Sequence, residues 1–453
     1  MTGDAHSILP RILPPIGAIV KDVFRQLRSF ERLPRAEQEG IQARQLRHLL
    51  AHAREHSPFW ADRIARAGID PSREMTLADL IRLPPLTRTE VQANFEGMRA
   101  RDPSWNEADI ITHSTSGSTG QPVRLEKLRW VYRPLYDAVT QIDHTWQGRD
   151  ARRTLGVYRT KGTESDTGVW GPPSPWFGRV GRAYQRQILG HPVEELYEAL
   201  ERHRPSYVFA GPTMLAALAR VAQEQGRPVP QVEQFLTFSE QVTDQHRALA
   251  RDVFGARITD RYSSEECGWL ALQCPKHDHY HAMSAVNHLE VVDDAGQPCR
   301  PGEPGRVLVT SLHSYAMPLL RYEIGDMAEL GEACDCGITL PVIARIRGRI
   351  RDVVILPNGQ RQFVNLNLGG KIAGTEVLEH QTLLYSCDTV EVIVRCRGPL
   401  TEDTREALVK RVLDGFGYPF RVVVRQTDQA NWLGLHKRRE FEKVDRPYAE
   451  ATA

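Results

Sequence analysis

The chain has 453 residues, of which 41% are apolar and 25% are charged, and its formal net charge is +1. This length exceeds what a single hydrophobic core normally serves, so two or three domains are expected. The near-neutral charge excludes a strong overall attraction to nucleic acid or to an anionic membrane surface, and it favours a small-molecule partner.

The most apolar N-terminal stretch, residues 8–20, contains three prolines and is too short to span a bilayer. It also lacks a basic leader and a cleavage site, so we expect a packed N-terminal arm in a cytoplasmic protein with no membrane partner. The seven cysteines are an odd number and are unevenly spread, which favours reduced thiols, with a metal as an option, over a disulfide framework.

The first hundred residues are expected to be helical. Apolar residues recur there at spacings of three and four and define one helix face at Leu46, Leu49, Leu50 and Ala53. Two prolines at residues 84–85 end this pattern, and Thr87-Arg-Thr-Glu is typical of a capped helix start. We therefore predict that residues 1–100 form the helical N-terminal part of a large domain.

From about Ile110 onward, short apolar runs alternate with amphipathic stretches, which is typical of an α/β layer. A domain boundary is expected near residues 349–352, followed by a strand-like run and a turn. The remainder is expected to form a strand, a helix and a strand at residues 390–394, 404–413 and 420–424. The predicted fold class is α/β, with a core domain at residues 101–350 and a small mobile α+β domain at residues 351–453.

A loop of small and hydroxyl residues, Ser114-Thr-Ser-Gly-Ser-Thr-Gly-Gln-Pro, is the sharpest local signal. Small residues let the backbone approach a polyphosphate, while hydroxyls and amides can surround its oxygens. No Gly-Lys-Ser/Thr ends the loop, so it is not a Walker loop. A flexible polar linker is the alternative, but strand-like residues on both sides, 110–112 and 123–125, favour an ordered turn.

With this loop the chain resembles the adenylate-forming superfamily, whose signature loop reads Thr-Ser-Gly-Ser/Thr-Thr-Gly-x-Pro. The segments Leu49-Leu-Ala-His-Ala, Ser57-Pro-Phe-Trp and Leu83-Pro-Pro-Leu-Thr-Arg resemble its phenylacetate–CoA ligase and capsular-polysaccharide adenylyltransferase-like branch. The resemblance runs from about residue 40 to the C-terminus. It implies a large adenylation domain with a C-terminal lid, and it assigns to ATP binding the loop residues Ser116, Gly117, Ser118, Thr119 and Gly120.

The resemblance also implies an activity: a carboxylic acid reacts with ATP to give an acyl-AMP and pyrophosphate, and the acyl group then passes to a thiol. The thiol is that of CoA or of a carrier-protein phosphopantetheine. Two alternatives stay open. One is an adenylate-dependent amide or ester synthetase with an amine or hydroxyl acceptor, and the other is a catalytically inactive nucleotide-binding relative.

The segment Tyr262-Ser-Ser-Glu-Glu-Cys-Gly resembles the family element Tyr-Gly-x-Ser/Thr-Glu-x-Gly. The resemblance implies that Tyr262 stacks near adenine, that Ser264 belongs to the ATP site, and that Glu266 holds Mg²⁺. A carboxylate-bound Mg²⁺ would offset the repulsion between the phosphates and the substrate carboxylate. Ser263 and Glu265 depart from the family pattern, so which glutamate binds the metal stays open.

Three further motifs each point to one candidate site residue. Leu320-Arg-Tyr-Glu-Ile-Gly-Asp resembles the ribose motif, which implies that Asp326 accepts hydrogen bonds from the two ribose hydroxyls. Gly348-Arg-Ile-Arg-Asp resembles the hinge motif, which implies that Arg349 contacts ribose or phosphate. His436-Lys-Arg-Arg-Glu-Phe resembles the motif of the catalytic lysine. It implies that Lys437 stabilises charge at the reacting α-phosphate, with Lys443 as the alternative.

Two short clusters, Cys274-Pro-Lys-His-Asp-His-Tyr-His and Cys334-Asp-Cys-Gly, offer thiolates and imidazoles for a tetrahedral zinc ion. The resemblance implies a structural zinc site made of Cys274, His281, Cys334 and Cys336. His277 and His279 stay alternatives, as do a redox pair of the last two cysteines and an unligated set.

The acid is the least determined part of this hypothesis. Tyr207 is a candidate for the wall of an apolar or aromatic pocket, and a core position is the alternative. The resemblance implies that Gly211 and Pro212 approach the acyl site and that Glu240 lies beside adenine. An aryl acid, or another compact apolar acid, is the expected substrate.

Overall fold

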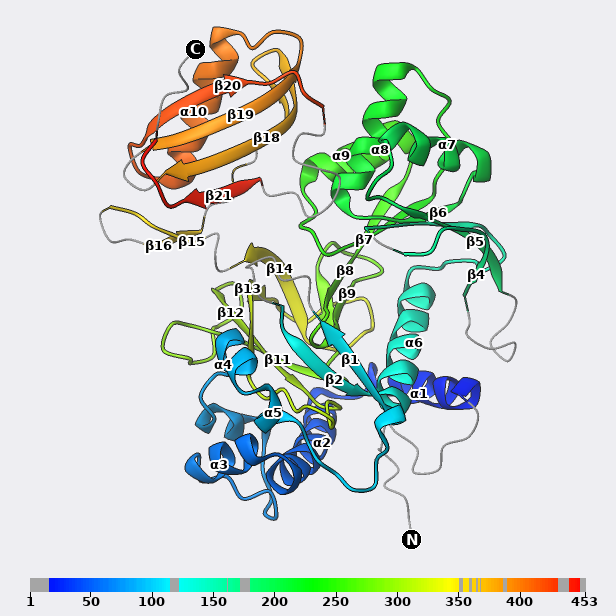
Figure 1. Cartoon of the computed structure of the whole chain (residues 1–453), viewed down its shortest axis with the longest axis vertical. Helices are drawn as coiled ribbons and strands as arrows, with labels where there is room; N and C mark the ends of the chain where they lie inside the picture. The colour runs from blue at the N-terminus through cyan, green and yellow to red at the C-terminus, as the bar shows by residue number, and fades with distance from the viewer. Residues whose placement is uncertain are drawn as a thin grey trace. The chain divides into compact units, whose positions relative to one another are not determined.

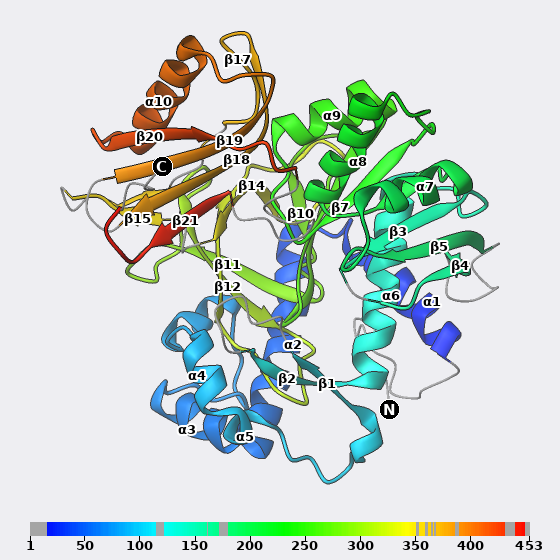
Figure 2. The same cartoon turned by 45° about the horizontal axis from the view of Figure 1, so that its top comes forward.

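The computed structural model describes residues 16–114, 122–160, 162–171, 180–349, 353–357, 361–363, 366, 368–385, 389–430 and 440–448. The chain divides into two compact units, whose elements are shown in Figures 1 and 2. Unit 1 comprises residues 1–153, 167–183 and 259–347, and unit 2 comprises residues 154–166, 184–258 and 348–453. The last segment of unit 2 begins near the expected boundary, but this unit also includes residues 184–258, so the three-domain limits stay a prediction.

Helices form the N-terminal part of unit 1. They are α1 (Ile16–Phe30), α2 (Arg35–His56), α3 (Pro58–Arg66), η1 (Leu77–Arg82), α4 (Arg88–Ala93), α5 (Phe95–Met98), η2 (Glu107–Asp109) and α6 (Arg129–Trp146). The predicted apolar stripe of α2 is confirmed, because its leucines at 46, 49 and 50 are fully buried. Thr87 caps α4 in a capping box with Glu90, which confirms the predicted helix start.

An antiparallel hairpin and a largely antiparallel sheet complete unit 1. The hairpin pairs β1 (Ile110–Ser114) with β2 (Arg124–Leu128) on either side of the glycine-rich loop. Within unit 1 the strands of the sheet follow the order β11-β12-β13-β14-β10-β9-β8. Its strands are β8 (Arg257–Ser264), β9 (Gly268–Gln273), β10 (Tyr280–Ala282), β11 (Asn287–Val292), β12 (Pro304–Ser311), β13 (Tyr322–Leu330) and β14 (Val342–Arg349).

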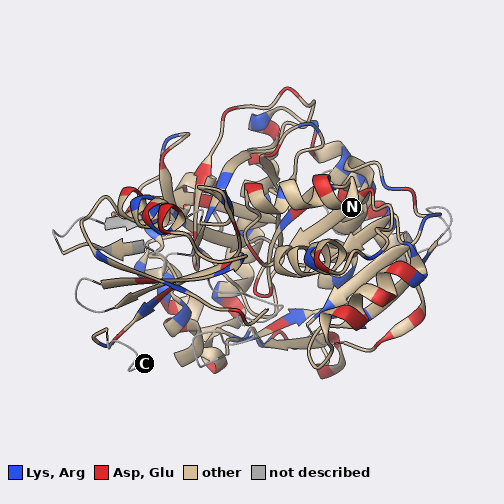
Figure 3. Cartoon of the chain, turned by 90° about the horizontal axis from the view of Figure 1, so that it is seen from above, with Lys and Arg blue, Asp and Glu red and all other residues tan. Residues whose placement is uncertain are grey.

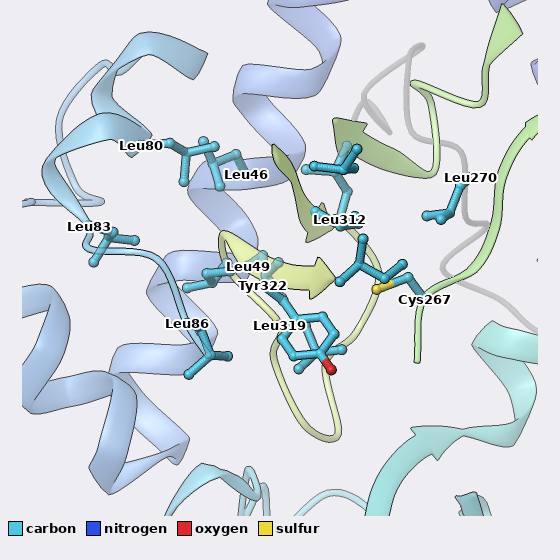
Figure 4. Close-up of a cluster of buried hydrophobic side chains, with 14 of the residues drawn as sticks. Leu46, Leu49, Leu80, Leu83, Leu86, Cys267, Leu270, Leu312, Leu319 and Tyr322 are labelled. Atoms are coloured by element: carbon cyan, nitrogen blue, oxygen red, sulfur yellow. The ribbon is translucent and has the colours of Figure 1, made fainter. Parts of the chain in front are cut away.

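The largest core of unit 1 joins the helical segment to this sheet. Leu46 and Leu49 of α2 lie in one cluster with Leu270 of β9 and Tyr322 of β13 (Figure 4). Each fully buried leucine contributes about 1.5–3 kcal/mol relative to an exposed one. The N-terminal helices are therefore part of the folded unit that carries β8 and β13.

Unit 2 contains a parallel sheet in which β6 (Tyr207–Phe209) lies between β3 (Leu155–Arg159) and β7 (Gln234–Phe238). The helices of this part are α7 (Val193–His203), α8 (Pro212–Gln225) and α9 (Asp244–Phe254). Strands β4 (Ser165–Trp170) and β5 (Gly181–Gln187) each contain a boundary between the units. Parallel strands joined by helices match the α/β pattern predicted from the sequence.

The C-terminal part of unit 2 is a smaller α+β assembly. Its elements are β15 (Val353–Ile355), β16 (Arg361–Phe363), β17 (Gly370–Ile372), β18 (Thr375–Tyr385), β19 (Thr389–Arg397), α10 (Glu402–Phe416), β20 (Arg421–Gln426) and β21 (Phe441–Val444). β19 and β20 pair in parallel around α10, which confirms the predicted strand, helix and strand. Within unit 2, Glu379 of β18 pairs with Arg220 of α8 at 3.1 Å, and both side chains are buried.

Charges of both signs alternate along the described elements (Figure 3). No described helix has the length and apolar character that crossing a membrane requires. The six cysteines in the described part of the chain are free thiols, as expected from their uneven spacing.

Candidate active site

Two of the predicted nucleotide-binding residues meet in unit 1. The Tyr262 hydroxyl on β8 donates a hydrogen bond of 2.8 Å to Oδ2 of Asp326 on β13. Both residues are buried. The contact orients the Asp326 carboxylate, whose two oxygens together offer about four lone-pair positions. Ser264, at the end of β8, accepts a hydrogen bond from the Cys267 amide at 3.0 Å and so shapes the turn that follows.

Glu266 lies in that turn, between β8 and β9. Its Oε1 is 3.3 Å from Nη1 of Arg88 and 3.4 Å from the Tyr322 hydroxyl. Burial, with Glu266 as a neighbouring negative charge, raises the pKa of Tyr322, so this phenol stays protonated and donates. Arg88 and Tyr322 stand within motifs quoted in the sequence analysis, but the sequence assigned them no role, because they approach Glu266 only through the tertiary fold.

Lys127, on β2, is another residue to which the sequence analysis assigned no role. Its ammonium donates a hydrogen bond of 2.7 Å to the Glu265 carbonyl and lies 4.1 Å from the centre of the Tyr132 ring. Burial lowers the pKa of Lys127 to about 8. An ammonium so removed from water requires compensation from its surroundings.

Lys127 and Glu266 line the same cavity of unit 1, which holds about 610 Å³ free of protein atoms, part of it open to solvent. Most of the lining is apolar or aromatic, with contributions from Leu128, Val131, Tyr132, Leu135, Tyr136, Val139, Trp269, Met317 and Leu319. His313 also lines it, and burial lowers the pKa of this imidazole to about 4, so it is neutral at pH 7. The cavity therefore suits a mainly apolar ligand.

The candidates of unit 2 form a separate group. Oε2 of Glu240 accepts hydrogen bonds from the amide and the hydroxyl of Thr213 at the start of α8. Gly211 is the N-cap of this helix, and a Cβ there would lie 2.7 Å from Oε1 of Glu240, so a larger residue would displace the Glu240 carboxylate. Pro212 is the first helical residue, and Tyr207 is buried on β6. None of these predicted pocket residues lines the cavity described in unit 1.

Most of the remaining candidates for nucleotide binding and catalysis lie outside the residues that the structure describes. Ser116, Gly117, Ser118, Thr119, Gly120 and Lys437 lie outside the described residues. Arg349 is the last residue of β14, and its side chain also lies outside them. Lys443, the alternative to Lys437, is exposed on β21 and pairs through its backbone with Leu384.

Candidate metal ligands from both cysteine clusters converge in unit 1. The ligand atoms of Cys274, His279, His281 and Cys334 all lie within 4.8 Å of one another. The two sulfurs of this group are 3.8 Å apart. Sγ of Cys336 is 3.2 Å from Nε2 of His281, which adds a fifth candidate. Segments some sixty residues apart thus supply two thiols and two imidazoles, the donor types that zinc prefers.

The surroundings of this group orient its members toward a shared centre. His281 Nδ1 lies 3.3 Å from the Leu340 carbonyl, so a proton on Nδ1 leaves Nε2 as the ligand atom. Burial lowers the pKa of His281 to about 4, which keeps the imidazole neutral as a metal ligand requires. Nε2 of His279 is buried and has no hydrogen-bond partner among the described residues. His277 instead pairs with exposed Asp335 at 2.7 Å.

Comparison with known proteins bears on the class of the protein. The AMP-binding enzyme family model matches residues 184–315. The phenylacetate–coenzyme A ligase of Thermus thermophilus is 26% identical over 384 residues, which cover 82% of this chain and 81% of that relative. The phenylacetate–coenzyme A ligase of Pseudomonas putida is 25% identical over 340 residues, with coverages of 70% and 71%.

The fold agrees with these sequence matches. A solved structure of 2-hydroxyisobutyryl-CoA ligase in the postadenylation state aligns with 96% of this chain and 94% of its own, with a TM-score of 0.74 and 18% identity. The matched family model and the sequence relatives support the adenylate-forming superfamily. The similarity is to its phenylacetate–CoA ligase-like branch, as the resemblance implied.

Proposed function

We propose that the protein is an AMP-forming acid–CoA ligase. The observation that carries the proposal is the buried hydrogen bond between Tyr262 and Asp326, because these residues come from the two motifs to which the resemblance assigns adenine and ribose. The similarity to phenylacetate–CoA ligases over most of the chain supports the same activity. A buried carboxylate with a fixed orientation suits the recognition of a ribose diol.

The reaction would have two steps. A carboxylate oxygen of the acid attacks the α-phosphorus of ATP, the bond to the β-phosphate oxygen breaks, and pyrophosphate leaves. The thiol sulfur of CoA then attacks the acyl carbon, its proton goes to solvent or a base, and AMP leaves. Lys437 would stabilise the charge at the α-phosphate in the first step. Movement of the C-terminal domain between the steps would let one site serve both reactions.

Glu266 is the residue we propose for Mg²⁺, which supplies charge neutralisation at the phosphates when bound. Its carboxylate lies at the wall of the cavity and is only 10% exposed. Arg88, at 3.3 Å, compensates its charge in the present structure. Arg88 would thus compete with the cation for this carboxylate.

We also propose a structural zinc ion held by four of the five convergent cysteine and histidine side chains. Cys274, His281 and Cys334 are common to both possible sets, and the fourth ligand is His279 or Cys336. The buried and unpartnered Nε2 of His279 supports the first set, while the short approach of Cys336 to His281 supports the second. A site filled by four protein ligands has no open position for catalysis.

CoA is the acceptor that the similarity to CoA ligases favours. A carrier-protein thiol and an amine are the remaining options, the second of which would make the protein an amide synthetase. A catalytically inactive relative is the other alternative. The acid is proposed to be an aryl or another compact apolar acid, in keeping with the mostly apolar cavity.

Acid-dependent exchange of labelled pyrophosphate into ATP tests the proposal. A panel of aryl, amino and short aliphatic acids is expected to include at least one that supports exchange. Product analysis with CoA, with a carrier protein and with an amine then identifies the acceptor. ATP binding without exchange for every acid would favour the inactive relative, and exchange without any thioester would favour the amide or ester synthetase.

A further inference from the structure

One charged group that lines the cavity of unit 1 has no carboxylate within ion-pair distance among the described residues. Three carboxylate or ammonium groups belong to its lining, those of Glu126, Lys127 and Glu266. Each glutamate has its own arginine: Glu126 pairs with Arg99 at 2.9 Å, and Glu266 with Arg88 at 3.3 Å. Lys127 is the cation without an ion pair among the described residues.

The contacts of Lys127 are few for a buried ammonium. Of its three N–H donors, one is used by the Glu265 carbonyl at 2.7 Å, and the Tyr132 ring faces the charge at 4.1 Å. Only 8% of the residue is exposed. Removing an ammonium from water is costly unless an opposite charge or several acceptors replace the lost hydration. A neutral carbonyl and an aromatic face replace only part of it, and the Glu265 and Glu266 carboxylates act on the ammonium from beyond ion-pair distance.

We propose that Lys127 is a specificity-determining residue, and that the acid bound in this cavity carries a second anionic group that pairs with the Lys127 ammonium. The inference rests on the proposed function, because it takes this cavity as the acid site. The remaining apolar wall would hold the hydrocarbon part of the substrate, whether ring or chain, between the side chains of α6 and Trp269. The substrate class is thus a compact diacid with an apolar spacer.

The reacting carboxylate is a poorer partner for Lys127 than a second anionic group. Adenylation converts that carboxylate to the neutral acyl carbonyl of a mixed anhydride, whose remaining negative charge is on the phosphate, so an ion pair with the carboxylate would stabilise the substrate but be lost from the acyl-adenylate. Binding that is stronger in the ground state than in the transition state opposes catalysis. A second anionic group keeps its charge through both steps, so its pairing with Lys127 assists binding throughout.

A purely structural role predicts a different result. In that case the ammonium would serve only to hold the Glu265 carbonyl and the turn that carries Glu266. Loss of the ammonium would then weaken the binding of all acids alike. A specificity role predicts instead that loss of the ammonium changes the ratio of the affinities for a diacid and its matched monoacid.

The test compares matched acids on the intact protein and on Lys127→Met, which keeps the length of the side chain without its charge. The pairs are phenylacetate with 4-carboxyphenylacetate, and hexanoate with adipate. Binding is measured by calorimetry with a non-hydrolysable ATP analogue, and turnover by pyrophosphate exchange. For at least one pair, the intact protein is expected to bind the diacid more tightly. Lys127→Met is expected to reduce that preference by roughly ten- to hundredfold, the usual effect of losing a charged hydrogen-bond partner.

Lys127→Gln serves as the second variant, because it removes the charge but keeps a shorter side chain with an N–H donor. If Lys127→Met melts at a lower temperature than the unchanged protein, the ratio of diacid to monoacid affinity is measured on this second variant. A preference for monoacids, no binding of either diacid, or an equal loss for both members of a pair would overturn the proposal. Tight diacid binding without pyrophosphate exchange would instead uphold the role of Lys127 while contradicting the ligase activity.

Discussion

Tyr262 and Asp326, which are 64 positions apart in the chain, are joined by a hydrogen bond of 2.8 Å between β8 and β13. Each is 7% exposed. A second buried tyrosine–aspartate contact occurs in the same unit, where the Tyr280 hydroxyl donates to Oδ2 of Asp260 at 2.6 Å. Only the first contact belongs to the motifs assigned to the nucleotide. Removing each contact in turn therefore distinguishes a role in ATP binding from a general contribution to stability.

Tyr262→Phe is expected to raise the KM for ATP by about tenfold, because it removes a hydrogen bond to a charged acceptor and loosens the Asp326 carboxylate. Steady-state pyrophosphate exchange at varied ATP measures this. Tyr280→Phe is the matched control. Tyr280→Phe should lower the melting temperature about as much as Tyr262→Phe does, but it should leave the KM for ATP unchanged. Equal effects of the two changes on KM would contradict the assignment.

Lys437→Ala is expected to abolish adenylation while ATP still binds, because the lysine would act on charge that develops in the transition state. Calorimetric ATP binding and pyrophosphate exchange separate the two effects. Lys443→Ala is the control, since Lys443 is exposed on β21. If exchange survives the first change and fails with the second, the catalytic role belongs to Lys443.

Zinc is expected to co-purify at about one ion per chain, since the proposal assigns one set of four ligands to each chain. Cys274→Ser and Cys334→Ser should each lower the zinc content and the melting temperature, because a structural zinc site contributes directly to folding free energy. Cys299→Ser is the control, as this thiol lies outside the cluster. Elemental analysis and thermal unfolding measure both quantities. A protein that contains no zinc and is fully stable would contradict the proposed zinc site.

Asp143 is expected to make stability depend on acid pH. Burial opposes its ionisation, but Arg149 and Arg261 outweigh burial and hold the pKa of Asp143 well below its usual range. An aspartate with a lowered folded-state pKa stabilises the protein above the unfolded pKa of about 3.9, and this contribution is lost as the pH falls below that value.

Asp143→Asn should therefore lower the free energy of unfolding at pH 7 by about 3–5 kcal/mol, the usual cost of breaking a buried ion pair. The difference from the unchanged protein should narrow as the pH falls below about 4. Urea unfolding at several pH values measures both effects. Asp150→Asn, which affects an exposed pair with Arg152, is the control and should change stability little. A constant difference across the pH range would contradict this account.

Local patterns were sufficient for much of the fold. The spacing of Leu46, Leu49 and Leu50 predicts the buried face of α2, and Thr87 with Glu90 predicts the start of α4. These features depend on residues within one or two helical turns, so they are visible in the sequence alone. The division into compact units was less accessible, because residues 184–258 and the C-terminal residues share a unit only through long-range contacts.

For the site, the sequence by itself determined the chemical class, because ordered motifs name the residues that adenylation requires, among them Tyr262, Glu266 and Asp326. It also indicated the two clusters of potential zinc ligands. Only the tertiary structure decided that Arg88 pairs with Glu266, and that Lys127 is buried in the cavity wall without a carboxylate partner among the described residues. Burial and charge pairing arise between segments as many as 178 positions apart, and no local pattern encodes such distances.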